Sequence, residues 1–270
     1  LVDIKSNPDK IKALQSRFKT CQQTSTSADV DKVINFIDNA YIYMAMTNYP
    51  YPTEFLAPMP GWPVDESCKP FNFTAEPQTI QHLLKEDSSV FDTEDQLLNA
   101  VVASMTTYYN YTGTTKCYDL NGEGTPNLDA KGWDILACNE MCMPMGTNGT
   151  NDMFLPMQFD EEAYSKRCQD EYGVTPQFDF ALTYFGGRHI THDFMYASNI
   201  VFSNGDIDPW SAGSVTKNVG KNTVVINIEN SAHHLDLRDP NPADPQSVVK
   251  ARDIERKEIK RWLDEYAQTE

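Results

Sequence analysis

Two short apolar segments near the C-terminal end constrain the fold of this chain most. Residues 198–205 form an apolar run that ends in Asn-Gly, and residues 223–229 are rich in β-branched side chains. Both patterns are typical of buried β-strands. Asp244-Pro245 then begins a segment with apolar residues on one helical face, so strand, loop, strand, loop and helix follow one another. This order predicts the end of an α/β sheet.

The chain before these segments has a different pattern. Apolar residues at helical spacing predict helices that begin near Asn7 and near Ser27. Two further helical regions are expected from about Thr93 to Tyr109 and from Asp160 to Tyr172. The second helix must end before Tyr49-Pro50, because proline lacks a backbone donor and restricts the residue before it. A chain of 270 residues is long for one domain and short for two. We therefore expect a helical domain over residues 1–195 and an α/β portion over residues 196–270.

Charge and hydropathy exclude several classes of partner. The chain has 39 acidic and 22 basic residues, a formal net charge of -17. Such a balance repels nucleic acid phosphates and anionic membrane surfaces, and it is common in proteins of acidic compartments. No apolar run approaches the roughly 18 residues that span a bilayer. The sequence thus predicts neither a nucleic acid partner nor a membrane span.

The cysteines and glycosylation motifs point to the secretory pathway. None of the six cysteines belongs to a paired C-x-x-C array, so their spacing does not predict a zinc site. Three Asn-x-Thr sequons, at Asn72, Asn110 and Asn148, lie in the same part of the chain. In a secreted or lysosomal protein we expect the cysteines to form disulfides.

Chemistry-bearing residues follow both expected strands. The first loop reads Asn204-Gly-Asp-Ile-Asp-Pro-Trp210, and the second reads Ser231-Ala-His-His-Leu-Asp-Leu-Arg238. An acid and then a histidine is the order in which α/β-hydrolases place the last two members of a catalytic triad, after a nucleophilic serine. From spacing alone, an acid and a histidine in ordinary surface loops are the preferred interpretation.

A wider set of segments accompanies these loops: TNYPYPTEFLAPMPGWPV, YYNYTGTTKC, GWDILACNE, TNGTNDMF and DPQSVVKARDIERKEIKRW. Together with SNGDIDPW and SAHHLDLR, they resemble the prolyl carboxypeptidase family of serine peptidases. That family includes a lysosomal Pro-Xaa carboxypeptidase and a lysosomal dipeptidyl peptidase that cleaves after Xaa-Pro. The resemblance covers nearly the whole chain. It implies an α/β-hydrolase domain preceded by a disulfide-bonded helical cap, a lysosomal or secreted location, peptide substrates with proline near one end, and no cofactor.

The resemblance also implies roles for single residues. Asp208 matches the triad acid, with Asp206 as the competing acid, because the family motif places the acid just before Pro-Trp. His233 matches the base. His234 is the competing base, although a supporting position beside His233 is its preferred interpretation. An acid in this role fixes the tautomer of the histidine and stabilises the imidazolium.

Substrate contacts are expected from three further positions. Trp210 and Met143 would form apolar walls near the site, because a proline ring offers no donor. Arg238 would either meet a substrate carboxylate or pair with Asp236, and the pairing is the preferred interpretation.

The sequence departs from the family at the nucleophile. No Gly-x-Ser-x-Gly elbow is present, so we expect an upstream segment or chain to supply the serine and the oxyanion-hole donors. The resemblance pairs Cys21 with Cys117 and Cys138 with Cys168. It gives the remaining two cysteines mates that precede Leu1, although these two could instead pair with each other: Cys68 and Cys142.

Several alternatives stay open at this point. The long loop over residues 50–63 favours a carboxypeptidase over an Xaa-Pro dipeptidyl peptidase. A catalytically silent surface glycoprotein would keep the fold, disulfides and glycans without the serine. His189, His192 and Asp193 have a spacing that could bind a metal, although a surface loop is the preferred interpretation. The physiological substrate and a possible homodimer are not determined by the sequence.

Overall fold

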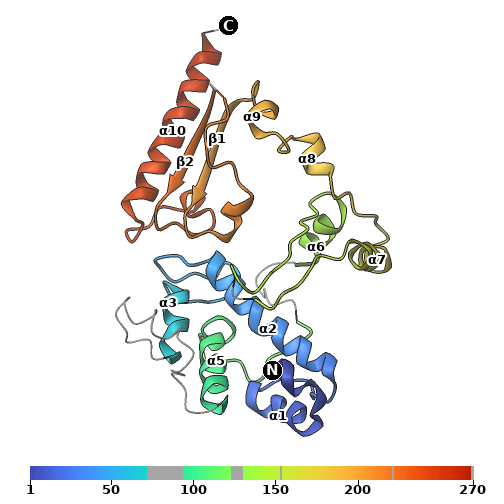
Figure 1. Ribbon diagram of the computed structural model, residues 1–270. Helices are drawn as coiled ribbons and strands as arrows, with labels where there is room; N and C mark the ends of the chain where they lie inside the picture. Colours follow the sequence, from blue (N-terminus) through green and yellow to red (C-terminus); the bar gives the residue numbers. More distant parts are fainter. Residues whose placement is uncertain (72–93, 123–129, 153, 221, 269–270) are drawn as a thin grey trace. The chain divides into compact units, whose positions relative to one another are not determined.

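The structure is a computed structural model that describes residues 1–71, 94–122, 130–152, 154–220 and 222–268 (Figure 1). It combines helices with a small β-sheet and contains two disulfides. The chain divides into two compact units. The first unit consists of Leu1–Asn127, Gly205–Trp210 and Glu229–Val248, and the second consists of Leu128–Asn204, Ser211–Ile228 and Val249–Glu270. Because residues 196–270 are divided between both units, the expected domain boundary near residue 195 stays a prediction. Each unit is described by itself.

The first unit is built around helices. Its α-helices are α1 (Pro8–Phe18), α2 (Ser27–Met46), α3 (Pro63–Cys68) and α5 (Glu94–Tyr109), and its 3-10 helices are η1 (Val2–Ser6), η2 (Lys69–Phe71) and η4 (Leu235–Leu237). The first two α-helices begin at side-chain caps. Asn7 accepts the backbone N–H of Lys10, and Thr26 forms a reciprocal capping box with Asp29. These caps satisfy N–H groups that have no partner within a helix.

A single apolar core holds these helices together. Phe18 of α1, Val33 and Met44 of α2, and Met105 of α5 have no exposed surface. Full burial of each such side chain is worth about 1.5–3 kcal/mol. The Cys21–Cys117 disulfide closes the same unit beside a backbone bridge in which the Cys21 N–H donates to the Tyr118 carbonyl oxygen. The end of α1 is thereby fixed to the segment that follows α5.

The second unit contains the sheet. Its helices are α6 (Ala130–Asn139), α7 (Glu161–Tyr172), α8 (Phe180–Tyr184) and α9 (Ile190–Asp193), with most of α10 (Gln246–Ala267) and part of η3 (Pro209–Gly213). Strands β1 (Ser198–Gly205) and β2 (Asn222–Ile228) pair with each other. Their bounds agree with the two expected strands to within one residue.

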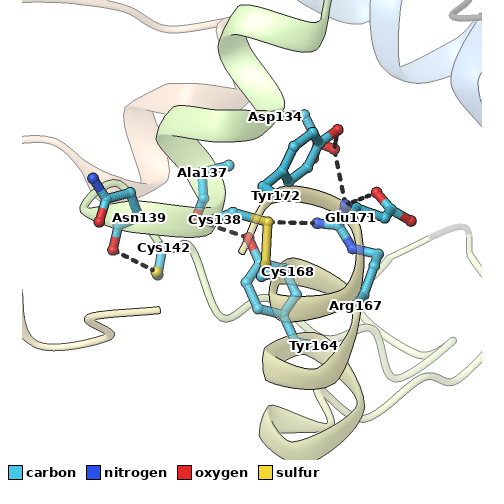
Figure 2. Close-up of a disulfide and its surroundings, with 10 residues drawn as sticks. All are labelled: Asp134, Ala137, Cys138, Asn139, Cys142, Tyr164, Arg167, Cys168, Glu171 and Tyr172. Atoms are coloured by element: carbon cyan, nitrogen blue, oxygen red, sulfur yellow. Dashed lines mark hydrogen bonds and ion pairs between the residues drawn. A yellow bond between two sulfur atoms is a disulfide. The ribbon is translucent and has the colours of Figure 1, made fainter. Parts of the chain in front are cut away.

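A disulfide between Cys138 and Cys168 joins α6 to α7 (Figure 2). Around it, the Arg167 guanidinium donates to Asp134 at 2.8 Å and to the Cys138 sulfur at 3.4 Å. The Tyr172 hydroxyl donates to the same Asp134 carboxylate at 2.6 Å. These contacts cross between the two helices, so α6 and α7 are linked both covalently and by hydrogen bonds.

The other two cysteines carry free thiols. Cys68 is exposed at the end of α3, and Cys142 is half-buried after α6, where burial raises its thiol pKa. Their pairing with each other, which the sequence left open, is therefore not observed. The two pairs that do form are those implied by the family resemblance.

The sequon asparagines have different environments. Asn72 lies outside the described residues. Asn110 is half-buried at the end of α5, and Asn148 is exposed in a turn where its Oδ1 accepts the N–H groups of Thr150 and Asn151. Within the described part of the chain, no helix has both the length and the hydropathy needed to cross a membrane.

The loops that follow β1 and β2 meet at a very close backbone contact. The Ile207 N–H donates to the Ser231 carbonyl oxygen, and the Ser231 N–H donates to Oδ1 of Asp206, each at 3.3 Å. A Cβ atom on Gly205 would lie 2.1 Å from that same Ser231 oxygen and 3.0 Å from the Ala232 oxygen. Only glycine fits at this position, because both neighbours are backbone atoms that a rotamer change does not move.

We expect Gly205→Ala to separate the two loops and to lower the free energy of unfolding by about 3 kcal/mol or more, because the added methyl group overpacks a backbone contact. Denaturant unfolding monitored by circular dichroism measures the change. Gly213→Ala is the matched control, since a Cβ there meets nothing within 4 Å. Equal stability of the two variants would contradict the close approach at Gly205.

Candidate active site

Asp208 is placed by the turn that follows β1. Its N–H donates to the Gly205 carbonyl oxygen at 3.3 Å, and its Oδ1 accepts the N–H of Trp210 at 2.9 Å. Pro209 begins the 3-10 helix η3 directly after it. One carboxylate oxygen therefore stabilises the turn while the other, Oδ2, faces His233. The Asp208 side chain is only 11% exposed.

His233 lies in the loop that follows β2, and its ring contacts Asp208. His233 Nδ1 lies 2.9 Å from Oδ2 of Asp208. A carboxylate at this distance favours the tautomer in which Nδ1 carries the proton. Nε2 is then the ring nitrogen that can accept a further proton, and the side chain remains 29% exposed. The pair has the geometry of a general base oriented by an acid.

Asp206, the competing acid, has a different partner. Its Oδ1 accepts the Ser231 N–H in the contact between the two loops. Of the two acids in the first loop, the structure thus brings Asp208 to the His233 ring and uses Asp206 to join the loops.

His234 stacks beside the site. Its ring centroid lies 4.3 Å from that of His233, and its edge-to-face contact with Phe55 spans 5.4 Å. Burial lowers the pKa of His234, and the nearby His233 and Arg238 act in the same direction, against smaller opposing effects of a backbone hydrogen bond and of Asp208. The second imidazole is therefore biased toward its neutral form.

Trp210 provides an apolar surface next to the His233 ring. The two ring centroids are 5.9 Å apart, and the indole Nε1 lies 3.0 Å from Sδ of Met46. The indole is 36% exposed. It thus combines contact with His233 with access to solvent, as a substrate-facing wall requires.

Arg238 has aromatic neighbours in place of the expected acidic one. Its guanidinium lies over the rings of Tyr49 at 4.6 Å and Phe55 at 5.5 Å, and it donates to Thr53 Oγ1 at 3.4 Å. Arg238 is the extended residue directly after η4, the 3-10 helix that contains Asp236. Among the described residues no ion pair of Arg238 is formed, and the preferred pairing with Asp236 is replaced by these contacts.

Two candidates from the sequence lie in the second unit. Met143 is half-buried in the segment that follows α6, and its proximity to His233 stays a prediction. The Asp193 carboxylate accepts the N–H groups of Gly187 and His189, which hold its pKa down to about 2. The described residues include no group of three or more side chains that could hold a metal ion.

Sequence reasoning missed the contacts made by the segment that follows α2. The His233 N–H donates to the Met46 carbonyl oxygen at 3.1 Å, and the Tyr49 hydroxyl donates to the His233 carbonyl oxygen at 2.9 Å. Tyr49 had been used only to end a helix. A large amphipathic side chain inside a Pro-rich loop was the one available signal, since tyrosine usually finds a hydrogen-bond partner when buried.

Comparison of the sequence with known proteins places this chain in a family. Residues 4–255 match the family described as serine carboxypeptidase S28. The chain is 40% identical over 238 residues to a lysosomal Pro-X carboxypeptidase of Mus musculus, covering 88% of this chain and 44% of the relative. It is 36% identical over 241 residues to a lysosomal Pro-X carboxypeptidase of Homo sapiens, covering 89% and 45%.

A more distant relative agrees with these two. Prolyl carboxy peptidase like protein 5 of Caenorhabditis elegans is 34% identical over 250 residues, covering 88% of this chain and 46% of the relative. The chain spans less than half the length of the curated relatives it matches. With a family match over most of its residues, this chain belongs to the serine carboxypeptidase S28 family of peptidases.

Proposed function

We propose that this chain supplies the acid and the base of a serine peptidase that cleaves after proline near the C-terminus of a peptide. The observation that carries the proposal is the 2.9 Å contact between Asp208 and His233, made by the two loops that follow β1 and β2. The name Pro-X carboxypeptidase, printed for several relatives, supports the carboxypeptidase direction over the Xaa-Pro dipeptidyl direction.

The proposed mechanism is acyl transfer. The hydroxyl of a serine attacks the carbonyl carbon of the proline residue in the Pro-Xaa bond, and His233 Nε2 takes the hydroxyl proton. His233 then returns that proton to the leaving amine, and a water molecule releases the acyl group by the same two proton transfers in turn. Asp208 orients the ring and stabilises the imidazolium that forms between these transfers.

The nucleophile is proposed to come from a different segment. The chain contains no Gly-x-Ser-x-Gly motif, and it covers only 44% and 45% of the length of two relatives that it matches. The exposed thiol of Cys68 and the half-buried thiol of Cys142 are available for disulfides to that segment. We propose the helical region over residues 1–195 as a cap and residues 196–270 as part of an α/β-hydrolase domain.

Three side chains are proposed to contact substrate. Trp210 would form an apolar wall for the proline ring, and Met143 would add to it. Arg238 donates to Thr53 Oγ1 and also interacts with the Tyr49 hydroxyl, while a guanidinium carries five N–H groups, so further donors are available for a substrate carboxylate. The planar fork of arginine matches a carboxylate in geometry.

The cellular setting is proposed from the relatives and the surface chemistry. Relatives with the printed name lysosomal Pro-X carboxypeptidase support a lysosomal location. Two disulfides fit an oxidising pathway of synthesis. We propose N-glycans at Asn148 and Asn110, and also at Asn72.

We expect Asp208→Asn to lower kcat about 10⁴-fold on a peptide that ends in Pro-Xaa, because the amide favours the wrong histidine tautomer. KM should change little, since Asp208 acts through His233. Asp206→Asn is the matched control, and its kcat should stay within about tenfold of the wild-type value, since this change weakens only a hydrogen bond between the two loops. A larger loss for Asp206→Asn than for Asp208→Asn would exchange the two roles.

The lowered pKa of His234 predicts a pH effect on stability. Its pKa in the fold lies below the ordinary value of 6.5, so the unfolded chain binds more protons between the two values. The stability that neutral His234 contributes is present above the unfolded pKa and is lost as the pH falls through the folded one. His234→Asn, which tolerates the positive φ of 44° at this position, should reduce the fall in Tm between about pH 7 and pH 5.

His192→Asn is the control for this titration, because the His192 side chain is 82% exposed. Thermal unfolding of both variants and the wild type at several pH values measures the difference. An unchanged pH dependence in His234→Asn would remove the proposed contribution.

Fluorophosphonate labelling tests the proposed peptidase directly, because the reagent labels activated serines. The native preparation is isolated through this chain, labelled, and run on gels with and without reductant. We expect the label to migrate with this chain before reduction and to separate from it afterwards, as a disulfide-linked serine segment requires. Cys68→Ser and Cys142→Ser then identify the bridging thiol.

The other outcomes each remove a part of the proposal. Label that separates without reductant would exclude the inter-chain disulfides but keep the serine peptidase. Label that stays with this chain in both gels would place the serine on the same polypeptide. If nothing labels while a related active peptidase labels under the same conditions, the proposed peptidase activity is overturned. A catalytically silent glycoprotein is then the better account.

A further inference from the structure

The main chain of His233 is held on both sides by one short segment. The N–H of His233 donates to the carbonyl oxygen of Met46, the last residue of α2. The carbonyl oxygen of His233 accepts a hydrogen bond from the hydroxyl of Tyr49, which lies three residues after Met46 in the chain. Both backbone groups of the proposed base are therefore satisfied by residues 46–49, which are about 185 positions away in the sequence.

The Tyr49 hydroxyl is suited to a permanent donor role. Tyr49 has no exposed surface, and burial raises its pKa to about 12 despite the opposing effect of Arg238. The hydroxyl thus keeps its proton throughout the pH range in which peptidases work. The Arg238 guanidinium lies 4.6 Å from the centre of the Tyr49 ring, and Trp62 donates its N–H to the Tyr49 carbonyl oxygen at 2.7 Å. The donor is itself fixed in position.

The loop that carries His233 needs such support. His233 belongs to neither β2 nor η4, and the next residue, His234, has a left-handed backbone with φ of 44°. This conformation is uncommon for a residue with a side chain and persists where surrounding contacts maintain it. The Tyr49 hydroxyl binds the carbonyl group of the peptide bond that joins these two residues, so it fixes the peptide plane at the site of this backbone turn.

We propose that Tyr49 is a positioning residue for the proposed base, whose hydroxyl fixes the main chain of His233 so that the ring meets Asp208 through Nδ1 and presents Nε2 to the nucleophile. The inference rests on the proposed function and adds to it a residue that touches neither substrate nor the reacting atoms. A displacement of the order of 1 Å at a reacting group lowers turnover by up to roughly 10²-fold. Loss of the hydroxyl should therefore appear in kcat.

Tyr49→Phe tests this role by removing one oxygen atom and keeping the ring beneath Arg238. We expect kcat to fall about tenfold or more on a peptide ending in Pro-Xaa, with KM within about twofold, because the ring that packs against Arg238 is kept. In the same variant, the NMR resonance of the His233 Nδ1 proton should move upfield, as its hydrogen bond to Asp208 weakens. The NMR measurement needs no active nucleophile and is made on the same native preparation as the kinetic measurement.

Tyr109→Phe is the matched control. The Tyr109 hydroxyl also donates to a backbone carbonyl oxygen, that of Phe36, at the same distance of 2.9 Å and in the core of the same unit. The two variants should lose similar stability, about 1 kcal/mol, whereas only Tyr49→Phe should change kcat and the His233 resonance. Tyr51→Phe, which removes a neighbouring hydroxyl from the same loop, should change neither.

Each outcome decides between the two proposals. An unchanged kcat and an unchanged His233 resonance in Tyr49→Phe would overturn the positioning role. An equal loss of kcat in Tyr109→Phe would do the same, since it would reveal a general effect of stability. A wild type that neither labels with fluorophosphonate nor cleaves peptide would overturn the proposed function alone, because the resonance would still report whether Tyr49 orients His233.

Discussion

The close approach of the two strand-end loops at Gly205 is the constraint on which the rest of the site depends. A backbone contact this tight excludes any Cβ atom at Gly205 and allows Ile207 and Asp206 to form hydrogen bonds with Ser231. Only with the loops at this separation do Asp208 and His233, 25 residues apart, meet at 2.9 Å. The contact between the proposed acid and the proposed base therefore depends on how closely the backbones of the two loops pack.

Much of the fold follows from local patterns, and the exceptions have a physical reason. The periodicity of apolar residues located α1 and α2 because each spans three turns or more and buries one face. Helices α8 and α9, with five and four residues, are too short to show a period. Helix α6 was not predicted; the Cys138–Cys168 disulfide and the Asp134 hydrogen bonds join it to α7, and no local pattern reveals such contacts.

The candidate site was predictable only where a local sequence pattern indicates it. The order of acid and histidine after two strands indicated the loops, but the choice between Asp206 and Asp208 depends on turn geometry that only the family motif suggested. Tyr49 and Arg238 contact partners 184 and 185 residues away. Such contacts leave no trace in spacing or composition, so the hydroxyl that holds His233 and the rings beneath Arg238 emerged only from the fold.

The structure divides the support of His233 between two kinds of contact. Its backbone is fixed by Met46 and Tyr49, and its ring is oriented by a single carboxylate, so no other protein group occupies the second ring nitrogen in the contacts that the structure describes. A base held mainly through its ring would sacrifice a nitrogen that proton transfer requires. Support through the main chain avoids this conflict, so Met46 and Tyr49 help to set the position of the proposed base without occupying either ring nitrogen.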